Sequence, residues 1–218
     1  MIYRSLAKFL LFLSCFSIVA YSTSVYAAGD RIYPFHYPRF YAGLAVGYGE
    51  TTWNELVTDD PLVEVSTPIE THDFGTLWGG FLGYQFGRSF ALEATYMRYP
   101  NTRIFLDDFT FYYPLTEFTT HSQVFSAIGK FIIPLANDRI NAFLDAGIAF
   151  THRNDVLANV TRVAPTFGLG FMSNISRHII TEIGFEYYIG YGKSDHIPVK
   201  DYIPFLFGVY FRLGYRIV

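Results

Sequence analysis

The stretch that decides the fold is FLFGVYFRLGYRI, residues 205–217. Every second residue in it is large and apolar, and we expect these side chains to face lipid: Phe205, Phe207, Val209, Phe211, Leu213, Tyr215 and Ile217. The residues between them are Leu206, Gly208, Tyr210, Arg212, Gly214 and Arg216. Because side chains alternate between the two faces of a strand, one face here is continuously apolar and the other is mostly small or charged.

Seven earlier stretches repeat this pattern. They are residues 40–50, 73–86, 90–98, 119–133, 139–152, 162–173 and 178–189. A tilted strand of about 9–11 residues crosses a bilayer, so the sequence predicts an all-β fold: an eight-stranded antiparallel up-and-down transmembrane β-barrel. The register of 119–133 stays open, because Phe125, Ala127 and Phe131 compete with Val124, Ile128 and Ile132 for the lipid face.

The connections between these strands alternate in length. Those at 87–89, 135–138 and 174–177 are tight and rich in turn-forming residues. Those at 51–72, 99–118, 153–161 and 190–203 are longer. In outer membrane barrels the short turns are periplasmic and the long loops extracellular, so we expect both termini in the periplasm.

The first 27 residues read as a cleaved secretory signal peptide. Arg4 and Lys8 precede an apolar run at 9–20, and small residues stand at the cleavage-site positions of Val25-Tyr26-Ala27. A lipoprotein site at Cys15 is the weaker alternative, because the apolar run before it is short. We therefore divide the chain into a signal peptide (1–27), an N-terminal periplasmic segment (28–39) and an outer membrane barrel (40–218).

The composition narrows the class of protein further. Cleavage removes the only cysteine and two of the 16 basic residues, which leaves 14 against 19 acidic ones and a net charge near −5. This charge argues against nucleic acid as a partner. Aromatic residues make up 20% of the chain, as the aromatic girdles of a membrane barrel require. A soluble sandwich or lipocalin-like barrel is the alternative, but its polar face would be rich in Lys, Glu, Thr and Ser.

Two stretches resemble a known family. GYQFGRSFALEATY, residues 83–96, resembles the second hairpin of the outer membrane protein A transmembrane domain, and Phe40-Tyr41-Ala42-Gly43 with Gly47-Tyr48 is similar to its first strand. The resemblance extends over the mature chain and implies an eight-stranded outer membrane barrel without the family's peptidoglycan-binding domain. It implies little about function, because this scaffold supports many roles.

The chain also departs from the family pattern. The family places a Lys in strand four and an Arg in strand seven inside the barrel, and the matching positions here are Ala127 and Gly184. We therefore do not carry over the family's interior ion pairs. Barrel-assembly machinery, an expected partner, usually recognises a terminal aromatic residue, whereas this chain ends in Ile217-Val218.

The interior charges form the main candidate site. On the lumen-facing phase we place an ionic cluster of Glu93, Asp145, Glu182, Glu186, Arg212 and Arg216. Arg212 should reach Glu186 on the neighbouring strand or Glu93 across the lumen. We favour a packed polar plug over a gated ion path, because side chains nearly fill an eight-stranded barrel.

No motif indicates an enzyme, a metal site or a cofactor. The histidines lack metal-ligand spacing, and no glycine-rich nucleotide loop is present. His121 with Ser122, and His152 with Asp155, are weak candidates for a lipid-modifying site. We expect no catalytic residues, no bound metal and no cofactor.

The long connections carry the remaining functional hypothesis. The loops at 51–72 and 99–118 contain many apolar residues, among them Trp53 and Ile104-Phe105-Leu106. Either these residues form a contact surface, or the strands extend beyond the membrane and the residues pack against one another. The leading hypothesis is an integral outer membrane protein with a structural and surface-interaction role. Its expected partners are outer membrane lipid or lipopolysaccharide and, through these loops, host or surface ligands. A narrow pore for small solutes is the alternative, followed by a lipid-modifying enzyme.

Overall fold

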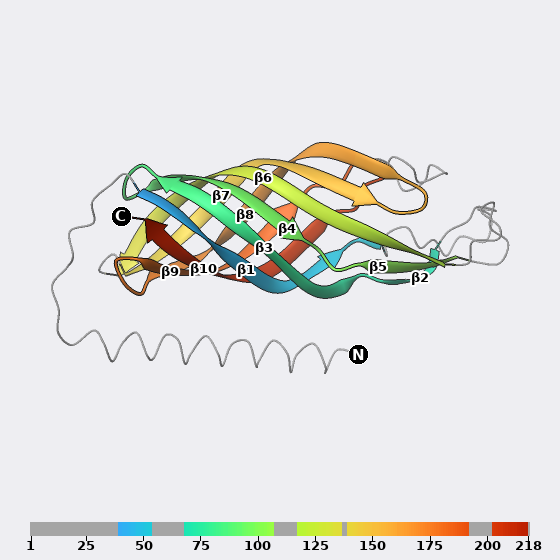
Figure 1. Cartoon of the computed structure of the whole chain (residues 1–218), viewed down its shortest axis with the longest axis horizontal. Coiled ribbons are helices and arrows are strands. Elements are labelled where there is room, and N and C mark those ends of the chain that lie inside the picture. Colours follow the sequence, from blue (N-terminus) through green and yellow to red (C-terminus); the bar gives the residue numbers. More distant parts are fainter. Residues whose placement is uncertain (1–38, 54–67, 107–116, 137–138, 192–201, 218) are drawn as a thin grey trace. The chain divides into compact units, whose positions relative to one another are not determined.

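The computed structural model describes residues 39–53, 68–106, 117–136, 139–191 and 202–217 (Figure 1). These residues all belong to one unit of the chain, His36–Val218. The expected signal peptide and residues 28–38 of the N-terminal segment lie outside the described residues. Within the described part of the chain, no helix is long and apolar enough to cross a membrane.

Ten strands form one antiparallel sheet. They are β1 (Arg39–Thr51), β2 (Pro68–His72), β3 (Phe74–Gln85), β4 (Phe90–Arg98), β5 (Thr102–Leu106), β6 (Glu117–Ala136), β7 (Ile140–Asn154), β8 (Asn159–Asn174), β9 (Ile179–Tyr188) and β10 (Leu206–Ile217). Eight of them pair in the order β1-β3-β4-β6-β7-β8-β9-β10, and β10 pairs with β1 to close the ring. The structure thus confirms the predicted eight-stranded antiparallel barrel, which Figure 1 shows from the side.

The other two strands, β2 and β5, extend the barrel wall at the end away from the C-terminus (Figure 1). β2 precedes β3 with only Asp73 between them, and β5 follows β4 after Tyr99-Pro100-Asn101. β2 pairs with β5, and β5 pairs with the start of the 20-residue strand β6. Parts of the connections at 51–72 and 99–118 are therefore strands, as in the alternative in which the strands extend beyond the membrane.

The register of β6, which the sequence left open, is now defined. Phe131 lies opposite Phe90 on β4, and Phe125 lies opposite Tyr96. Phe125 and Phe131 are about half exposed, whereas Val124, Ile128 and Ile132 are buried. The set containing Phe125, Ala127 and Phe131 therefore faces outward, and the even-numbered residues from 118 to 132 fill the interior.

The outer surface of the barrel is an apolar band. Large side chains exposed on its strands include Leu44, Trp78, Leu82, Leu92, Leu144 and Leu169. On β10 the outward residues are Val209, Phe211, Leu213, Tyr215 and Ile217, and Phe205 precedes the strand with its ring stacked on Tyr187. A water-soluble sandwich would bury these rows, so this band is the lipid-facing surface of a membrane barrel.

Polar side chains mark the end of the band nearest β2 and β5. The Tyr96 hydroxyl donates a hydrogen bond to Gln123 Oε1 at 3.2 Å, and His152 Nδ1 lies 2.9 Å from Thr161 Oγ1. One step further from the band, His121 Nδ1 lies 2.7 Å from Asn101 Oδ1. These outward-facing groups satisfy one another or water, as expected where a strand leaves hydrocarbon.

Glycines inside the barrel leave room for large polar rings. A Cβ atom at Gly83 would collide with the ring of Tyr41 on the adjacent strand β1. Without that Cβ, Tyr41 lies across Gly83 and points its hydroxyl at Glu93. The Gly-Tyr-Gln of the second hairpin therefore has a packing role, because it positions a hydrogen-bond donor in the lumen.

Candidate functional site

The centre of the lumen holds five charged side chains, which we call the ionic layer. They are Glu93 on β4, Lys130 on β6, Glu182 and Glu186 on β9, and Arg212 on β10. All lie on the inward phase of their strands and all are buried. A charge removed from water and lipid in this way must be paired to be tolerated.

Lys130 joins two carboxylates on different sides of the lumen. Its ammonium lies 2.5 Å from Glu93 Oε1 and donates to Glu182 at 2.8 and 3.0 Å. Glu93 is on the neighbouring strand β4, whereas β9 is separated from β6 by β7 and β8. Lys130 therefore connects strands that share no backbone hydrogen bonds. Its ammonium also lies 4.5 Å from the ring centroid of Phe143.

Arg212 makes the second set of connections. Its Nη1 donates to Glu93 Oε2 at 3.1 Å and lies 3.6 Å from Glu182 Oε2, and its Nη2 lies 3.6 Å from Glu186 Oε2. The guanidinium also stacks 4.1 Å from the ring centroid of Tyr210. Arg212 thus contacts both residues that the sequence offered as alternatives, Glu186 on the adjacent strand and Glu93 across the lumen.

Neutral donors complete the ionic layer. The Tyr41 hydroxyl donates to Glu93 Oε1 at 2.6 Å, and the Tyr99 hydroxyl donates to Glu186 Oε1 at 3.2 Å. The Thr95 and Ser126 hydroxyls bond to each other at 2.5 Å beside the layer. Each carboxylate of the layer contacts at least one cation, and Glu93 and Glu186 also accept hydrogen bonds from tyrosine hydroxyls. The ionic layer therefore links strands across the lumen.

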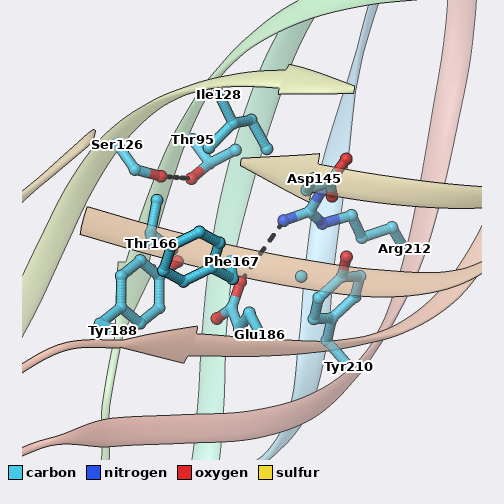
Figure 2. Close-up of a pocket in the computed structure, with 11 residues that line it drawn as sticks. Thr95, Ser126, Ile128, Asp145, Thr166, Phe167, Glu186, Tyr188, Tyr210 and Arg212 are labelled. Atoms are coloured by element: carbon cyan, nitrogen blue, oxygen red, sulfur yellow. Dashed lines mark hydrogen bonds and ion pairs between the residues drawn. The ribbon is translucent and has the colours of Figure 1, made fainter. Parts of the chain in front are cut away.

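Asp145 is the exception among the interior acids. It faces Lys130 in register from β7, but among the described residues its Oδ1 receives no hydrogen bond. It borders a cavity of about 10 Å³, room for roughly one water molecule. Figure 2 shows this cavity with Arg212 extending into it and Glu186 paired with the guanidinium.

Apolar side chains cover the ionic layer along the barrel axis. Toward the turns, Ile132, Met172 and Ile180 fill the interior, and toward the long connections Leu77, Met97 and Leu206 do so. These residues belong to one buried apolar cluster that surrounds the charged side chains. The described lumen therefore contains a polar layer between apolar layers rather than a water-filled channel.

Arg216 stands apart from the layer. It is buried close to the turn end of the barrel, and its Nη2 donates to Asn174 Oδ1 at 2.6 Å. The six residues predicted from the sequence are thus all inside the barrel. Glu93, Glu182, Glu186 and Arg212 meet in the ionic layer, whereas Asp145 borders the cavity and Arg216 lies near the turn end. Lys130, the residue that joins the acids, was not among the six.

A second cluster, which we call the loop-end core, lies at the opposite end, where the long connections begin. It consists of Trp53, Ile104, Phe118, Leu157, Tyr202 and the buried Arg153. Trp53 follows β1, Leu157 lies in the β7–β8 connection and Tyr202 precedes β10. The apolar loop residues were expected either to form a contact surface or to pack against one another. Trp53 and Ile104 pack together in this cluster. Leu56, Val57, Leu62, Val63, Val65 and residues 109–113 lie outside the described residues.

Arg153 organises the loop-end core. Its Nε donates to Asp155 Oδ2 at 2.6 Å, its Nη1 donates to the Tyr202 carbonyl at 2.8 Å, and its guanidinium lies 4.6 Å from the Trp53 ring centroid. Asp155 Oδ1 in turn accepts the backbone N–H groups of Leu157 and Ala158. One arginine therefore ties the β7–β8 turn to the segment before β10 and to the end of β1.

The candidate lipid-modifying sets are not assembled. His121 faces outward toward Asn101, whereas Ser122 is buried on the other face of β6. His152 bonds Thr161, and Asp155 is bound to Arg153. In the described residues, no group of three or more potential ligands could hold a metal ion.

The model of one protein family, the OmpA-like transmembrane domain, matches residues 37–216. The chain belongs to that family. It is an integral β-barrel protein of the bacterial outer membrane, and the predicted family resemblance is confirmed. No curated protein sequence matches the chain.

Solved barrels of similar fold accompany the family match. Pseudomonas aeruginosa OprG has a TM-score of 0.51 at 12% identity, with 84% of this chain and 97% of OprG covered. The β-barrel domain of Pseudomonas aeruginosa OprF has a TM-score of 0.48 at 10% identity, covering 83% and 100%. Yersinia pestis Ail, solved with the heparin analogue sucrose octasulfate, has a TM-score of 0.42 at 11% identity, covering 82% and 99%.

This OmpA-like barrel has Ala127 and Gly184 where the family places its interior cations, so the family's own ion pairs could not be carried over from the sequence. The interior acids are paired with cations from other positions. Lys130, three residues after Ala127, supplies the β6 cation, and Arg212 supplies the other from β10. At Gly184 the space of a side chain is taken by Tyr210 and Phe143.

Proposed function

We propose that this OmpA-like barrel is a closed, non-enzymatic scaffold that presents its long connections at the cell surface as a contact surface and contributes to envelope integrity. The observation that carries the proposal is the ionic layer. Its charges are paired across the bore and covered by apolar side chains at both ends. Such an interior stabilises the barrel wall, and it leaves no continuous water-filled path through the lumen for a solute.

The proposed orientation places the tight turns and both termini in the periplasm. The turns at 87–89 and 175–178, together with Arg139 before β7, lie at the end of the barrel that holds the C-terminus of β10. The long connections leave from the other end, beyond β2 and β5. Short periplasmic turns and long extracellular loops are the usual arrangement in this class of barrel, which supports the assignment.

The loop-end core supports a role in surface contact. It packs the bases of several long connections against one another. The loops therefore begin from a rigid part of the structure. Binding residues are often carried on loops held by a rigid scaffold in this way. The proposed partners are lipopolysaccharide and host or surface ligands for the loops, with the barrel-assembly machinery during insertion.

Planar-bilayer conductance separates the closed scaffold from a narrow pore. Purified wild-type protein should give no stepwise openings, and a Glu93→Ala/Glu186→Ala variant, which removes two acids from the layer, should give more leak if it still inserts. Regular single-channel openings of the wild type would instead support the pore. Heat-modifiable gel migration verifies that each sample is folded.

Intact cells test the surface role. Epitope tags inserted between residues 59 and 60 and between 110 and 111 should bind antibody without permeabilisation, whereas a tag in the turn at 87–89 should not. Replacing 54–67 or 107–116 with Gly-Ser segments should reduce retention of purified lipopolysaccharide or attachment to matrix-coated plates. Hydrolysis of outer membrane lipid that is lost in His121→Ala or His152→Ala would overturn the non-enzymatic assignment.

A further inference from the structure

The three tight turns of the barrel share one feature. Each carries a single exposed arginine: Arg88 between β3 and β4, Arg139 before β7, and Arg177 between β8 and β9. The described residues of these turns contain no acid, and the sequence adds only Asp138. We call these three residues the turn arginines.

Exposed apolar side chains flank each turn arginine. Phe86 and Phe90 flank Arg88, Leu135 and Ile140 flank Arg139, and Ile175 and Ile179 flank Arg177. All six are at least 39% exposed and lie at the turn end of the apolar band. A strand rises about 3.3 Å per residue, and less along the axis when tilted. Each arginine therefore lies within a few ångströms of the edge of the band, at the level of lipid headgroups.

The opposite end of the barrel has the opposite charge. The connections at 54–67, 107–116 and 192–201 contain eight Asp or Glu residues and two Lys. The described residues at that end add Glu50, Glu70, Asp73, Glu117 and Asp155, against Arg98, Arg103, Arg153 and Arg162, so acidic residues outnumber basic ones there. The chain as a whole is net acidic, so its composition does not explain the basic turns. The basic residues are concentrated at one end of the barrel.

We propose that the turn arginines form a headgroup-binding rim for anionic phospholipid in the leaflet that the turns face. A guanidinium matches a phosphate with two parallel hydrogen bonds and stays charged at any physiological pH. A basic residue near an anionic lipid surface strengthens association, and the effect falls within a Debye length. The identification of that leaflet as the periplasmic one rests on the orientation proposed above.

The flanking side chains favour a lipid over a soluble phosphate. Each arginine is flanked in the chain by two exposed apolar side chains, so a ligand that offers both a phosphate and acyl chains matches the whole site. His178 adds a second polar group beside Arg177; its ring stacks on Tyr215 at 5.4 Å between ring centroids. Tyrosine at this level is typical of a membrane interface.

Fluorescence quenching by brominated lipid tests the rim directly. Trp53 is buried at 1% exposure, so a Trp78→Phe/Phe90→Trp protein reports on lipid beside Arg88. In symmetric vesicles at low salt, brominated phosphatidylglycerol should associate with this site at least twofold more strongly than brominated phosphatidylcholine. The preference should disappear in Arg88→Gln/Arg139→Gln/Arg177→Gln, persist in the corresponding triple Lys variant, and fall in 1 M NaCl.

Controls make the result specific. Trp78 of the otherwise unchanged protein lies on β3 away from the turn, and its quenching should not respond to the triple Gln substitution. Inorganic phosphate should compete no better than chloride at equal ionic strength; stronger competition would indicate a soluble-anion site and overturn the lipid assignment. Equal association of both lipids with the wild type would also overturn it. Because the vesicles are symmetric, the result does not depend on orientation, which the epitope tags test separately.

Discussion

Lys130 on β6 binds Glu182 on β9 through both carboxylate oxygens, at 2.8 and 3.0 Å, across a lumen in which these two strands are not neighbours. Backbone hydrogen bonds hold each strand only to the next one around the ring. The pair therefore adds a connection that the sheet itself does not contain, and it does so within a layer that is shielded from water. The stability of this barrel should depend on it.

Replacing Lys130 by Met should lower the free energy of unfolding by about 3–5 kcal/mol, because it leaves two buried carboxylates short of a cation. Urea titration in detergent micelles, followed by heat-modifiable gel migration, measures the change. A Lys130→Met/Glu182→Gln double variant should recover part of the loss. If the double variant is less stable than the single one, then the uncompensated charge is not the cause.

Tyr41→Phe should cost about 1–3 kcal/mol, since it removes the hydroxyl that donates to Glu93 while the ring still packs over Gly83. The matched control is Tyr215→Phe on the outer surface, where the ring stacks on His178 and should remain in place. Equilibrium unfolding of both variants in the same micelles makes the comparison. Equal stability of the two would mean that the Tyr41 hydroxyl contributes little to the layer.

Gly184→Ala should destabilise the barrel by about 1–3 kcal/mol through overpacking. Its Cβ would lie 2.6 Å from the Tyr210 hydroxyl oxygen and 3.0 Å from Phe143, both inside the lumen. Gly129→Ala is the control, because the nearest atom to its Cβ is 3.5 Å away. The control should stay within about 0.5 kcal/mol of wild type. Thermal melting by circular dichroism should order the three proteins accordingly.

Leu213→Arg should cost about 2–4 kcal/mol, because it places a charge on the lipid face near the middle of β10. The same change at Ile217, close to the turn end, should cost at most about 1 kcal/mol. Refolding into lipid vesicles, monitored by urea titration, compares the two positions. A larger penalty at Ile217 than at Leu213 would contradict the assigned position of the apolar band.

Arg153→Gln should loosen the loop-end core without opening the ionic layer. It removes the bonds to Asp155 and to the Tyr202 carbonyl, so local opening at the tip of the β7–β8 hairpin should become easier by about 2 kcal/mol. Amide hydrogen exchange there should accelerate by about thirtyfold, with β4 and β10 amides unchanged. Equal acceleration throughout the barrel would show that the two clusters are not independent.

The barrel itself could be predicted from the sequence because apolar residues recur at every second position of a strand whose outer face contacts lipid. This alternation is easy to recognise in a sequence. On β10 the alternation continues without interruption from Val209 to Ile217, and the structure follows it. Arg212 could be placed inside by the same counting. Glu186 could be named as a partner because β9 neighbours β10, and Glu93 because it lies at a similar height above the turn end. The third acid near Arg212, Glu182, was not named.

Lys130 was missed for a specific physical reason. Both faces of β6 carry apolar residues, since Val124 and Ile132 belong to the packed apolar cluster around the charges and Ile128 is buried beside the cavity. Hydrophobicity therefore could not choose the register of this strand. A signal existed nonetheless: a lysine is far costlier in lipid than in a lumen with acids, and that alone places Lys130 and the even-numbered residues inside.

The loop-end core could not be predicted at all from local patterns. Arg153, Trp53 and Tyr202 meet from three parts of the chain that are about 50 to 150 residues apart. Beyond the membrane the wall faces water on one side, so β2 and β5 lack the lipid-facing rows that revealed the other strands. Only the folded barrel brings these segments to one place.

Arg212 lies on the final strand, whereas its partner Glu93 lies on the third strand of the ring to be synthesised. Without β10, Glu93 would lack one of its two cations, and Glu186 would lack the guanidinium beside it. The last strand of the ring to be synthesised thus neutralises acids supplied by earlier strands. A chain truncated before its last dozen residues would keep those acids without that cation.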